Sequence, residues 1–175
     1  MPIRDQRPTR VLVLDIKKIG VTSPPELARV TGMSRQNAYN WWNAQRTFLY
    51  VTAYARLLIA SSGDGPLHAP GDWFRWEEGP DGPELVWQIQ AQAELRGMER
   101  IQFGYLAQLE QRSRDGVWNG SAQAAYTDTL ARIAQALHQR KHPFAIGSLF
   151  HWAKPDPPPD QPHWRRTPVA AGVRL

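Results

Sequence analysis

The chain has 175 residues, 42% of them hydrophobic, which is enough for one domain of ordinary size or two small ones. It contains no cysteine, and this excludes disulfides, thiolate chemistry and cysteine-based zinc sites. No apolar run approaches membrane-spanning length and the first residues lack a signal peptide's apolar stretch, so we expect a cytoplasmic protein without a membrane partner.

The net charge of +5 is distributed unevenly along the chain. Residues 1–65 carry a net charge of +5, residues 66–99 carry −5, and residues 100–175 carry +5 again. Two basic regions around an acidic one favour a polyanionic partner. Many basic proteins bind no nucleic acid, so the charge by itself assigns no function.

The first twenty residues contain no unambiguous element. Residues 1–9 hold Arg4, Arg7 and two prolines, and they predict an irregular arm that is either disordered or follows a DNA groove or backbone. Residues 10–20, RVLVLDIKKIG, fit a strand or a helix equally well by their periodicity.

Residues 23–46 predict two short helices joined by a tight turn. Ser23 and Glu26 form a capping-box pattern at the start of the first helix. Gly32 is placed to end that helix in a left-handed conformation, which glycine adopts at little cost. Ser34 then caps the second helix.

The second helix, Arg35–Asn43, has two chemically different sides. Ala38, Trp41 and Trp42 lie close to one side, where the tryptophans are expected to pack rather than to stack on bases. The other side is polar and carries Arg35, Gln36, Asn37 and Asn40. Arginine, glutamine and asparagine can form paired hydrogen bonds with guanine and adenine edges, although an ordinary solvated helix presents the same residue types.

The run ELARVTGMSRQNAYNWWNAQ resembles the Cro and lambda-repressor (XRE) family of helix-turn-helix DNA-binding domains. The match rests on Leu27-Ala28, Gly32-Met33-Ser34 and Trp41-Trp42-Asn43-Ala44, where Ala44 replaces the usual glycine. The resemblance implies a helix over residues 10–20, packed under the recognition helix. It implies base contacts from Arg35, Gln36 and Asn40, and the polar side of the helix adds Asn37 as a fourth candidate. Phosphate contacts are expected from Ser34, Asn43, Gln45, Arg46, Lys17 and Lys18.

The chain contains an internal repeat. Residues 47–62 predict one or two helices with Leu49, Tyr54, Leu57 and Leu58 in the core. The repeat is seen when residues 54–76 are aligned without gaps on residues 130–152. At an offset of 76 the identical pairs include Ala55/Ala131, Arg56/Arg132, Gly71/Gly147, Phe74/Phe150 and Trp76/Trp152. Nearer the N-terminus the offset becomes 79, pairing Leu27-Ala28 with Leu106-Ala107. We therefore predict a duplicated unit with three residues lost in the second copy.

The predicted loss falls where the second copy would have its recognition helix. Asp115-Gly116 predicts a turn there, so the recognition helix of this copy is shortened or replaced. Arg112, Arg114 and Asn119 would contact phosphates or would simply be exposed in a loop. Residues 127–137 predict an amphipathic helix.

Each unit is followed by a short apolar segment, 71–76 or 147–152. These segments are expected to pack against their own unit. The alternative is that the two segments pair as strands, either across the two halves or between subunits. The run EEGPDGPE at 77–84 predicts a linker, followed by a helix over roughly 83–97. The last 23 residues include six prolines and predict an extended tail.

We find no pattern of catalytic residues. His138 and His142 have the spacing of a helical metal pair, but no glutamate lies between them and Pro143 follows. No Gly-rich phosphate loop or serine elbow is present. We therefore expect no enzyme, no metal and no cofactor.

Together these patterns predict an all-α protein of two tandem helix-turn-helix bundles, each with its apolar tail. The predicted parts are a flexible arm (1–9), a first domain (10–76), a linker (77–83), a degenerate second domain (84–152) and a Pro-rich tail (153–175).

The predicted function is sequence-specific binding of double-stranded DNA by a transcriptional regulator of the phage, plasmid or mobile-element kind. A homodimer is left open. One alternative is a protein-interaction module, antitoxin-like or adaptor. Another is single-strand binding, which requires the rings of Trp41, Trp42, Trp73 and Trp76 to be exposed.

Overall fold

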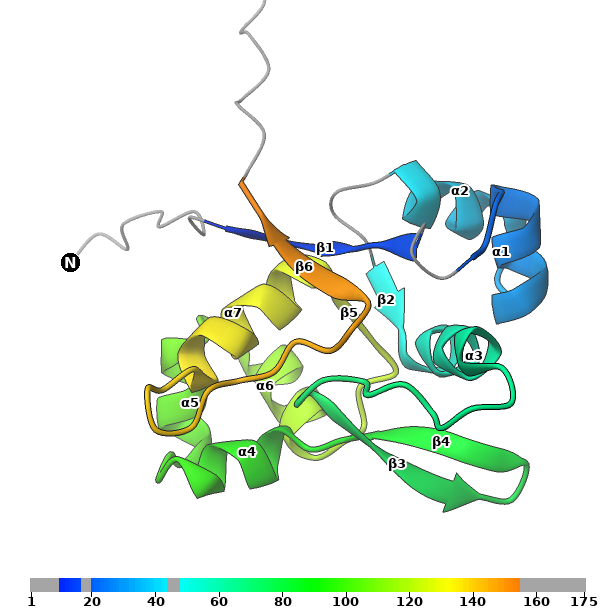
Figure 1. The fold of residues 1–175 in the computed structure, drawn as a ribbon. Coiled ribbons are helices and arrows are strands. Elements are labelled where there is room, and N and C mark those ends of the chain that lie inside the picture. The colour runs from blue at the N-terminus through cyan, green and yellow to red at the C-terminus, as the bar shows by residue number, and fades with distance from the viewer. Residues whose placement is uncertain (1–9, 17–19, 44–47, 155–175) are drawn as a thin grey trace, which may run out of the picture.

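The computed structural model describes residues 10–16, 20–43 and 48–154, and it divides into two halves with the same order of elements (Figure 1). The first half, residues 10–79, contains β1 (Val11–Leu14), α1 (Pro24–Thr31), α2 (Arg35–Asn43), β2 (Phe48–Tyr50), α3 (Val51–Ser62) and β3 (Phe74–Gly79). The second half, residues 82–154, contains β4 (Gly82–Trp87), α4 (Ile89–Leu95), α5 (Arg100–Leu106), α6 (Gln111–Trp118), β5 (Ala124–Tyr126), α7 (Thr127–Leu137) and β6 (Phe150–Ala153). Only α4 lacks a counterpart among the described residues of the first half.

The prediction of an all-α protein is wrong. The described residues form six strands in three antiparallel two-stranded sheets, β1–β6, β2–β5 and β3–β4. Each sheet pairs one strand of the first half with one strand of the second half. The two halves are therefore joined by strand exchange, and the protein is mixed α and β.

The helix predicted over residues 10–20 is replaced at its start by β1. Val11 and Val13 are β-branched, and along β1 half-buried and buried side chains alternate, which is the pattern of a strand with one face on the core. The partner of β1 is β6, so the strand is stabilised by pairing with residues 150–153 at the other end of the described chain. The residues near β1 in the sequence do not indicate this distant partner.

The helix predicted over residues 83–97 is likewise wrong in its first half. Pro83 lies in β4, opposite Glu78 of β3, and α4 begins only at Ile89. The acidic run that predicts a linker instead forms the end of the β3–β4 hairpin, which turns between Gly79 and Gly82. The two apolar tail segments supply β3 and β6, which pair with β4 and β1 and not with each other. The first segment also packs on its own unit, as predicted, because the Phe74 ring lies 6.0 Å from that of Tyr54 and the Trp76 indole donates to the carbonyl of His68.

The register of β2 and β5 places a pseudo-twofold axis through the centre of the molecule. Leu49 pairs with Ala125, and these two residues are separated by the repeat offset of 76. On either side, Phe48 pairs with Tyr126 and Tyr50 with Ala124, so the pairing is reciprocal. An antiparallel pair of this kind has its twofold axis normal to the ribbon, and this axis preserves which face points inward. Consistently, Leu49 and Ala125 are both buried.

The offset of 76 also holds for the helices before this ribbon, and the predicted loss of three residues is wrong. Leu27 of α1 and Phe103 of α5 are 76 residues apart and both fully buried. The turns that follow contain Gly32 and Gln108 at the same offset, each with a positive φ angle. The segment predicted to turn at Asp115-Gly116 is helical and forms α6, the counterpart of α2.

The same arginine interaction appears in both halves. Arg56 of α3 donates from Nη1 to the carbonyl of Thr31 (3.2 Å), at the end of α1. Arg132 of α7 donates from Nη1 to the carbonyl of Gln108 (3.1 Å), just after α5. Each arginine thus satisfies a carbonyl at a helix C-terminus, where backbone acceptors lack partners within the helix.

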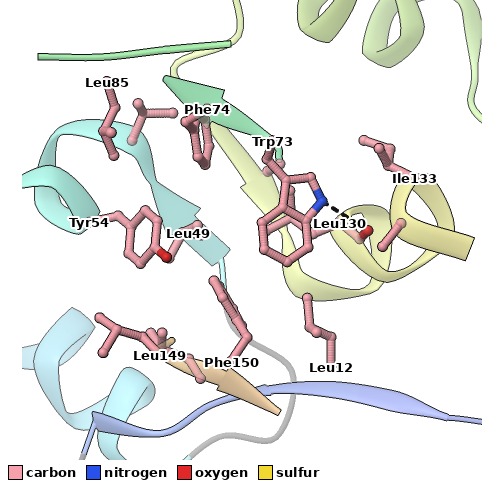
Figure 2. Packing of buried hydrophobic residues seen from close by; sticks show 14 of the residues in the cluster. Leu12, Leu49, Tyr54, Trp73, Phe74, Leu85, Leu130, Ile133, Leu149 and Phe150 are labelled. Carbon is pink, nitrogen blue, oxygen red and sulfur yellow. Dashed lines mark hydrogen bonds between the residues drawn. The ribbon is translucent and has the colours of Figure 1, made fainter. Parts of the chain in front are cut away.

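One hydrophobic cluster extends through both halves, and Trp73 lies in it (Figure 2). This side chain is fully buried, and its indole Nε1 donates to the carbonyl of Leu130 in α7 (3.3 Å). The ring centroids of Phe144 and Phe150 lie 5.6 and 5.1 Å from that of Trp73, in edge-on arrangements. A tryptophan that precedes β3 of the first half therefore packs among aromatic residues of the second.

Two equivalent glycines meet where the halves cross. Gly71 and Gly147 have φ angles of 85° and 82°, and a Cβ on Gly147 would lie 2.9 Å from the nitrogen of Gly71. Next to them, the backbone N–H of Asp72 donates to the carbonyl of Ala145 (2.7 Å), and the N–H of Ala145 donates to Oδ2 of Asp72 (2.7 Å). Side chains at the two glycines would push this crossing apart.

Candidate nucleic-acid interface

The α1–α2 pair forms as the local sequence predicts. Ser23 is the N-cap of α1, and its Oγ accepts from the N–H of Glu26 (3.4 Å). Gly32 ends α1 in the left-handed conformation and donates its N–H to the carbonyl of Ala28. Ser34 caps α2, because its Oγ accepts from the N–H of Asn37 (3.2 Å). These three predictions are confirmed.

The capping box differs from the predicted form in one bond. The Glu26 carboxylate accepts from the N–H and the hydroxyl of Thr22 (2.8 and 2.9 Å), one residue before the cap. These hydrogen bonds, together with the charge of Arg29, hold the pKa of Glu26 below its ordinary value. The first turn of α1 is thereby fixed to the chain that enters it.

The inner side of α2 anchors the helix to the body of the protein. Ala38 and Trp41 are buried, and the Trp41 indole donates from Nε1 to the carbonyl of Phe48 at the start of β2 (3.0 Å). Trp42 is half-buried and packs against the same core. This anchoring fixes which side of α2 faces away from the protein.

The outer side of α2 carries the residues predicted to contact bases. Arg35, Gln36 and Asn40 are exposed, whereas Asn37 is half-buried. Nε2 of Gln36 donates to Oδ1 of Asn40 (3.2 Å), so two of the predicted base-contacting side chains lie together one turn apart. Tyr39, which the sequence pattern did not single out, is exposed on this helix as well.

Arg35 carries the positive charge of this surface. It forms no ion pair with any residue in the described ranges, and the first turn of α2 contains no acidic residue. Its guanidinium is therefore available to an external acceptor such as a guanine edge or a phosphate.

The predicted phosphate contacts are only partly placed. Ser34 and Asn43 are exposed at the two ends of α2, and the hydroxyl of Ser34 is already used in capping. Four further predicted residues lie outside the described residues: Lys17, Lys18, Gln45 and Arg46.

Sequence reasoning considered Arg112 and Asn119 as phosphate contacts in a loop but missed the helix that holds this segment, α6, the equivalent of α2. Gln111, Arg112 and Ser113 begin α6 and are exposed, as are Arg35 and Gln36 at the start of α2. Extending the offset of 76 without interruption would have aligned these residues with Arg35–Asn37. The turn pattern at Asp115-Gly116 concealed this match.

An open groove of about 870 Å³ runs beside α6. Gln111, Arg112 and Ser113 line it from the helix, and Phe48 and Ala124 line it from the β2–β5 ribbon. Phe48 and Tyr126 pack edge to face on this outward side of the ribbon, with ring centroids 4.7 Å apart. The exposed start of α6 and the outward face of the ribbon therefore lie on one side of the molecule.

The tryptophans do not offer a stacking platform for single strands. Trp41 and Trp73 are buried, and Trp42 and Trp76 are half-buried against the core. The indole of Trp76 also donates to the carbonyl of His68 (3.1 Å). Single-strand binding through these four rings, which requires them exposed, loses its structural basis.

Within the described ranges, no three His, Asp or Glu side chains converge as a metal site would require. No described helix is long and apolar enough to cross a bilayer.

Comparison of the chain with protein-family models, with curated proteins and with solved structures gave no match. The likeness to the Cro and lambda-repressor family therefore rests on the residues of α1, α2 and the turn between them.

Proposed function

We propose that this protein binds double-stranded DNA with sequence preference and acts as a transcriptional regulator of the phage, plasmid or mobile-element kind. In this proposal α2 enters the major groove, Arg35 contacts guanine, and Gln36 or Asn40 contacts adenine. The protein would act in the cytoplasm, on the nucleoid when bound to DNA.

The observation that carries the proposal is the exposed outer side of α2. Three features support a binding role for α2 over an ordinary solvated helix. Ser34 caps its start, the Trp41 indole is hydrogen-bonded to β2, and Gln36 and Asn40 lie together on its outer side with groups that can bond to base edges. Here all three occur on one nine-residue helix, and Arg35 has no ion-pair partner among the described residues. Together they support a rigid helix that presents donors and acceptors to a groove.

Fluorescence anisotropy with labelled duplexes tests this function. Affinity should fall steeply and log-linearly with salt concentration, because phosphate contacts release counterions. Arg35→Ala should cost about 1–3 kcal/mol on a preferred duplex and much less on a random one. Arg140→Ala removes the same charge from an exposed site after α7 and serves as the matched control. Equal losses for Arg35→Ala on preferred and random duplexes would remove its base-contacting role.

A protein partner is the second candidate, and α5 supplies the observation that favours it. Ile101 and Tyr105, one turn apart, are 70% and 83% exposed, whereas their equivalents in α1 are Pro25 and Arg29. An antitoxin-like or adaptor protein could use such an apolar surface. Binding through it would change little with added salt, which separates this candidate from the DNA proposal.

A further inference from the structure

We infer that one chain contacts one duplex through two helices, α2 and α6, and recognises two unequal half-sites. This inference rests on the proposed function, because it assumes that α2 binds DNA. It adds a second contact surface, its chemistry and the stoichiometry of the complex.

The pseudo-twofold axis places the outer sides of α2 and α6 on the same side of the molecule. The axis is normal to the β2–β5 ribbon, so it carries outward-facing groups of one half onto outward-facing groups of the other. Arg112 lines a groove together with Phe48 and Ala124, which lie on the outward face of that ribbon. The rotation that carries α6 onto α2 therefore leaves Arg35 on this side too.

This arrangement has the twofold symmetry of a duplex. In Figure 1 the α1–α2 pair and the α5–α6 pair lie on opposite sides of the β2–β5 ribbon. Helix-turn-helix dimers bind two half-sites because their twofold axis coincides with a twofold axis of the DNA. Here the axis lies within a single chain, so a second copy is not needed to present a second helix.

The chemistry of α6 suits a nucleic acid. At the offset of 76, Arg35 and Gln36 correspond to Gln111 and Arg112, so each helix begins with one arginine and one glutamine in opposite order. Both α6 residues are exposed, and Arg112 forms no ion pair with a residue in the described ranges. Asn119, which follows α6, is exposed like its identical equivalent Asn43.

The one acidic residue of α6 does not oppose this role. The carboxylate of Asp115 lies 3.0 Å from Nε of Arg114 and 3.8 Å from Nη1 of Arg100. Two arginines therefore offset its charge, and Arg112 contributes its own charge to the surface.

The two half-sites must differ, because the two helices present different side chains. Asn40 of α2 corresponds to Gly116 of α6, so the second helix lacks an amide at that position. The arginine is also displaced by one position: Arg35 is the first residue of α2, whereas Arg112 is the second residue of α6. The preferred duplex is therefore expected to contain two different half-sites rather than a palindrome.

The experiment begins by selecting duplexes with the full-length chain from a library of about 25 randomised base pairs, which covers two half-sites one helical turn apart. The enriched duplex is the probe. Native mass spectrometry gives the number of chains bound to it. Anisotropy then compares Arg35→Ala, Arg112→Ala and the control Arg140→Ala on this probe and on versions with either half-site scrambled. Circular dichroism establishes that each variant is folded.

We expect one chain per duplex and two different enriched half-sites. Arg112→Ala should weaken binding to the probe about 5- to 100-fold, and should have little effect once the half-site read by α6 is scrambled. Arg35→Ala should show the same pattern for the other half-site. Arg140→Ala should act alike on all probes.

Two results would overturn the inference while leaving the proposed function intact. One is that Arg112→Ala changes affinity no more than Arg140→Ala does, while Arg35→Ala reduces the preference for the enriched probe. The other is that two chains bind one duplex with two identical half-sites. Failure of the proposed function itself has a different signature, namely no enriched sequence and no salt dependence of binding.

Discussion

The turn between α1 and α2 and the turn between α5 and α6 follow the same backbone path with different residues. In the first, Gly32 has a φ angle of 72° and no Cβ to make that angle costly. In the second, Gln108 has a φ angle of 52°, and among the described residues it is the one non-glycine with a positive φ. The surrounding structure thus imposes on a glutamine the conformation that glycine adopts freely.

The helix crossings differ in the same way. Ala38 of α2 is fully buried, whereas its equivalent in α6 is Arg114, whose aliphatic stem lies against Gly104 of α5. The position equivalent to Gly104 in α1 is Ala28. A larger residue on one helix is matched by a smaller one on the other, and the two halves keep one geometry with two sets of residues. The repeated backbone therefore persists where the sequence pattern of the motif has been lost.

The largest effect should come from the core that joins the halves. Trp73→Ala should lower the free energy of unfolding by about 3–5 kcal/mol, because it removes a fully buried ring and leaves a cavity. Leu149 is the equivalent residue in the second half, and Leu149→Ala should lower the free energy of unfolding by about 2–5 kcal/mol. Urea unfolding followed by circular dichroism should show one cooperative transition for both variants. Two separate transitions, with only one half weakened, would mean that the halves fold independently.

The glycine crossing should give the next largest effect. Gly71→Ala should cost about 2–4 kcal/mol, because a Cβ at this φ angle would also lie 2.8 Å from the backbone of Ile146. Gly97→Ala is the matched control: its φ angle of 70° is similar, but a Cβ there meets nothing within 4 Å. The control should cost only about 1–2 kcal/mol. Equal costs in chemical denaturation would show that backbone contact at the crossing contributes nothing.

A smaller effect, of opposite sign in the two halves, is expected at the two turns. Gln108→Gly should stabilise the protein by about 1 kcal/mol, since glycine accepts the positive φ angle without strain. Gly32→Gln should destabilise it by about 1–2 kcal/mol, and its side chain would have to displace the guanidinium of Arg56. Thermal unfolding of both variants measures these changes. Destabilisation by Gln108→Gly would show that the glutamine side chain itself holds the second turn.

The smallest effect concerns the start of α1, which has a side-chain cap, compared with that of α5, which has none. The pKa of Glu26 is lowered in the folded state, so its contribution is present above the ordinary value of 4.5 and is lost as the pH falls through the folded pKa. Glu26→Gln should therefore destabilise the protein slightly at neutral pH. The difference from wild type should vanish in acid. The equivalent residue in α5, Gln102, is already neutral, so Gln102→Ala should show no such dependence on pH. A pH-independent effect of Glu26→Gln would rule out the carboxylate as its cause.

The parts of the site that the sequence predicts correctly are those fixed by local contacts. Ser23, Gly32 and Ser34 each act on backbone groups within four residues, so their pattern is sufficient to place α1, the turn and the start of α2. α6 was missed because its turn has Gln108 where a glycine is expected, and because Gly116 lies inside the helix. A glycine within a helix costs only about 1 kcal/mol, which tertiary packing can offset.

The strands could not be predicted in the same way. β1 and β6 pair Leu12 with Trp152, so neither strand has its partner nearby in the sequence. β2 and β5 are three residues long, too short for an alternating pattern to be distinguished from a helix start. Pro83 and Glu84 resemble a helix N-terminus, and only the hairpin with β3 makes them a strand. The fold class depends on these long-range strand pairs, so it could not be predicted from local patterns. The exposed side of α2 depends on local residues and could be predicted.

The exchange of strands also means that the order of the two halves along the chain is not fixed by the fold. Val11 and Ala153 are partners at the open end of β1–β6, in the position that the tight turn occupies in β3–β4. A short connection from Ala153 to Val11, with a new opening at Pro80-Asp81, would give a circular permutant whose sequence begins with the second half. It would keep all three sheets and the glycine crossing, with α6 preceding α2 in the chain.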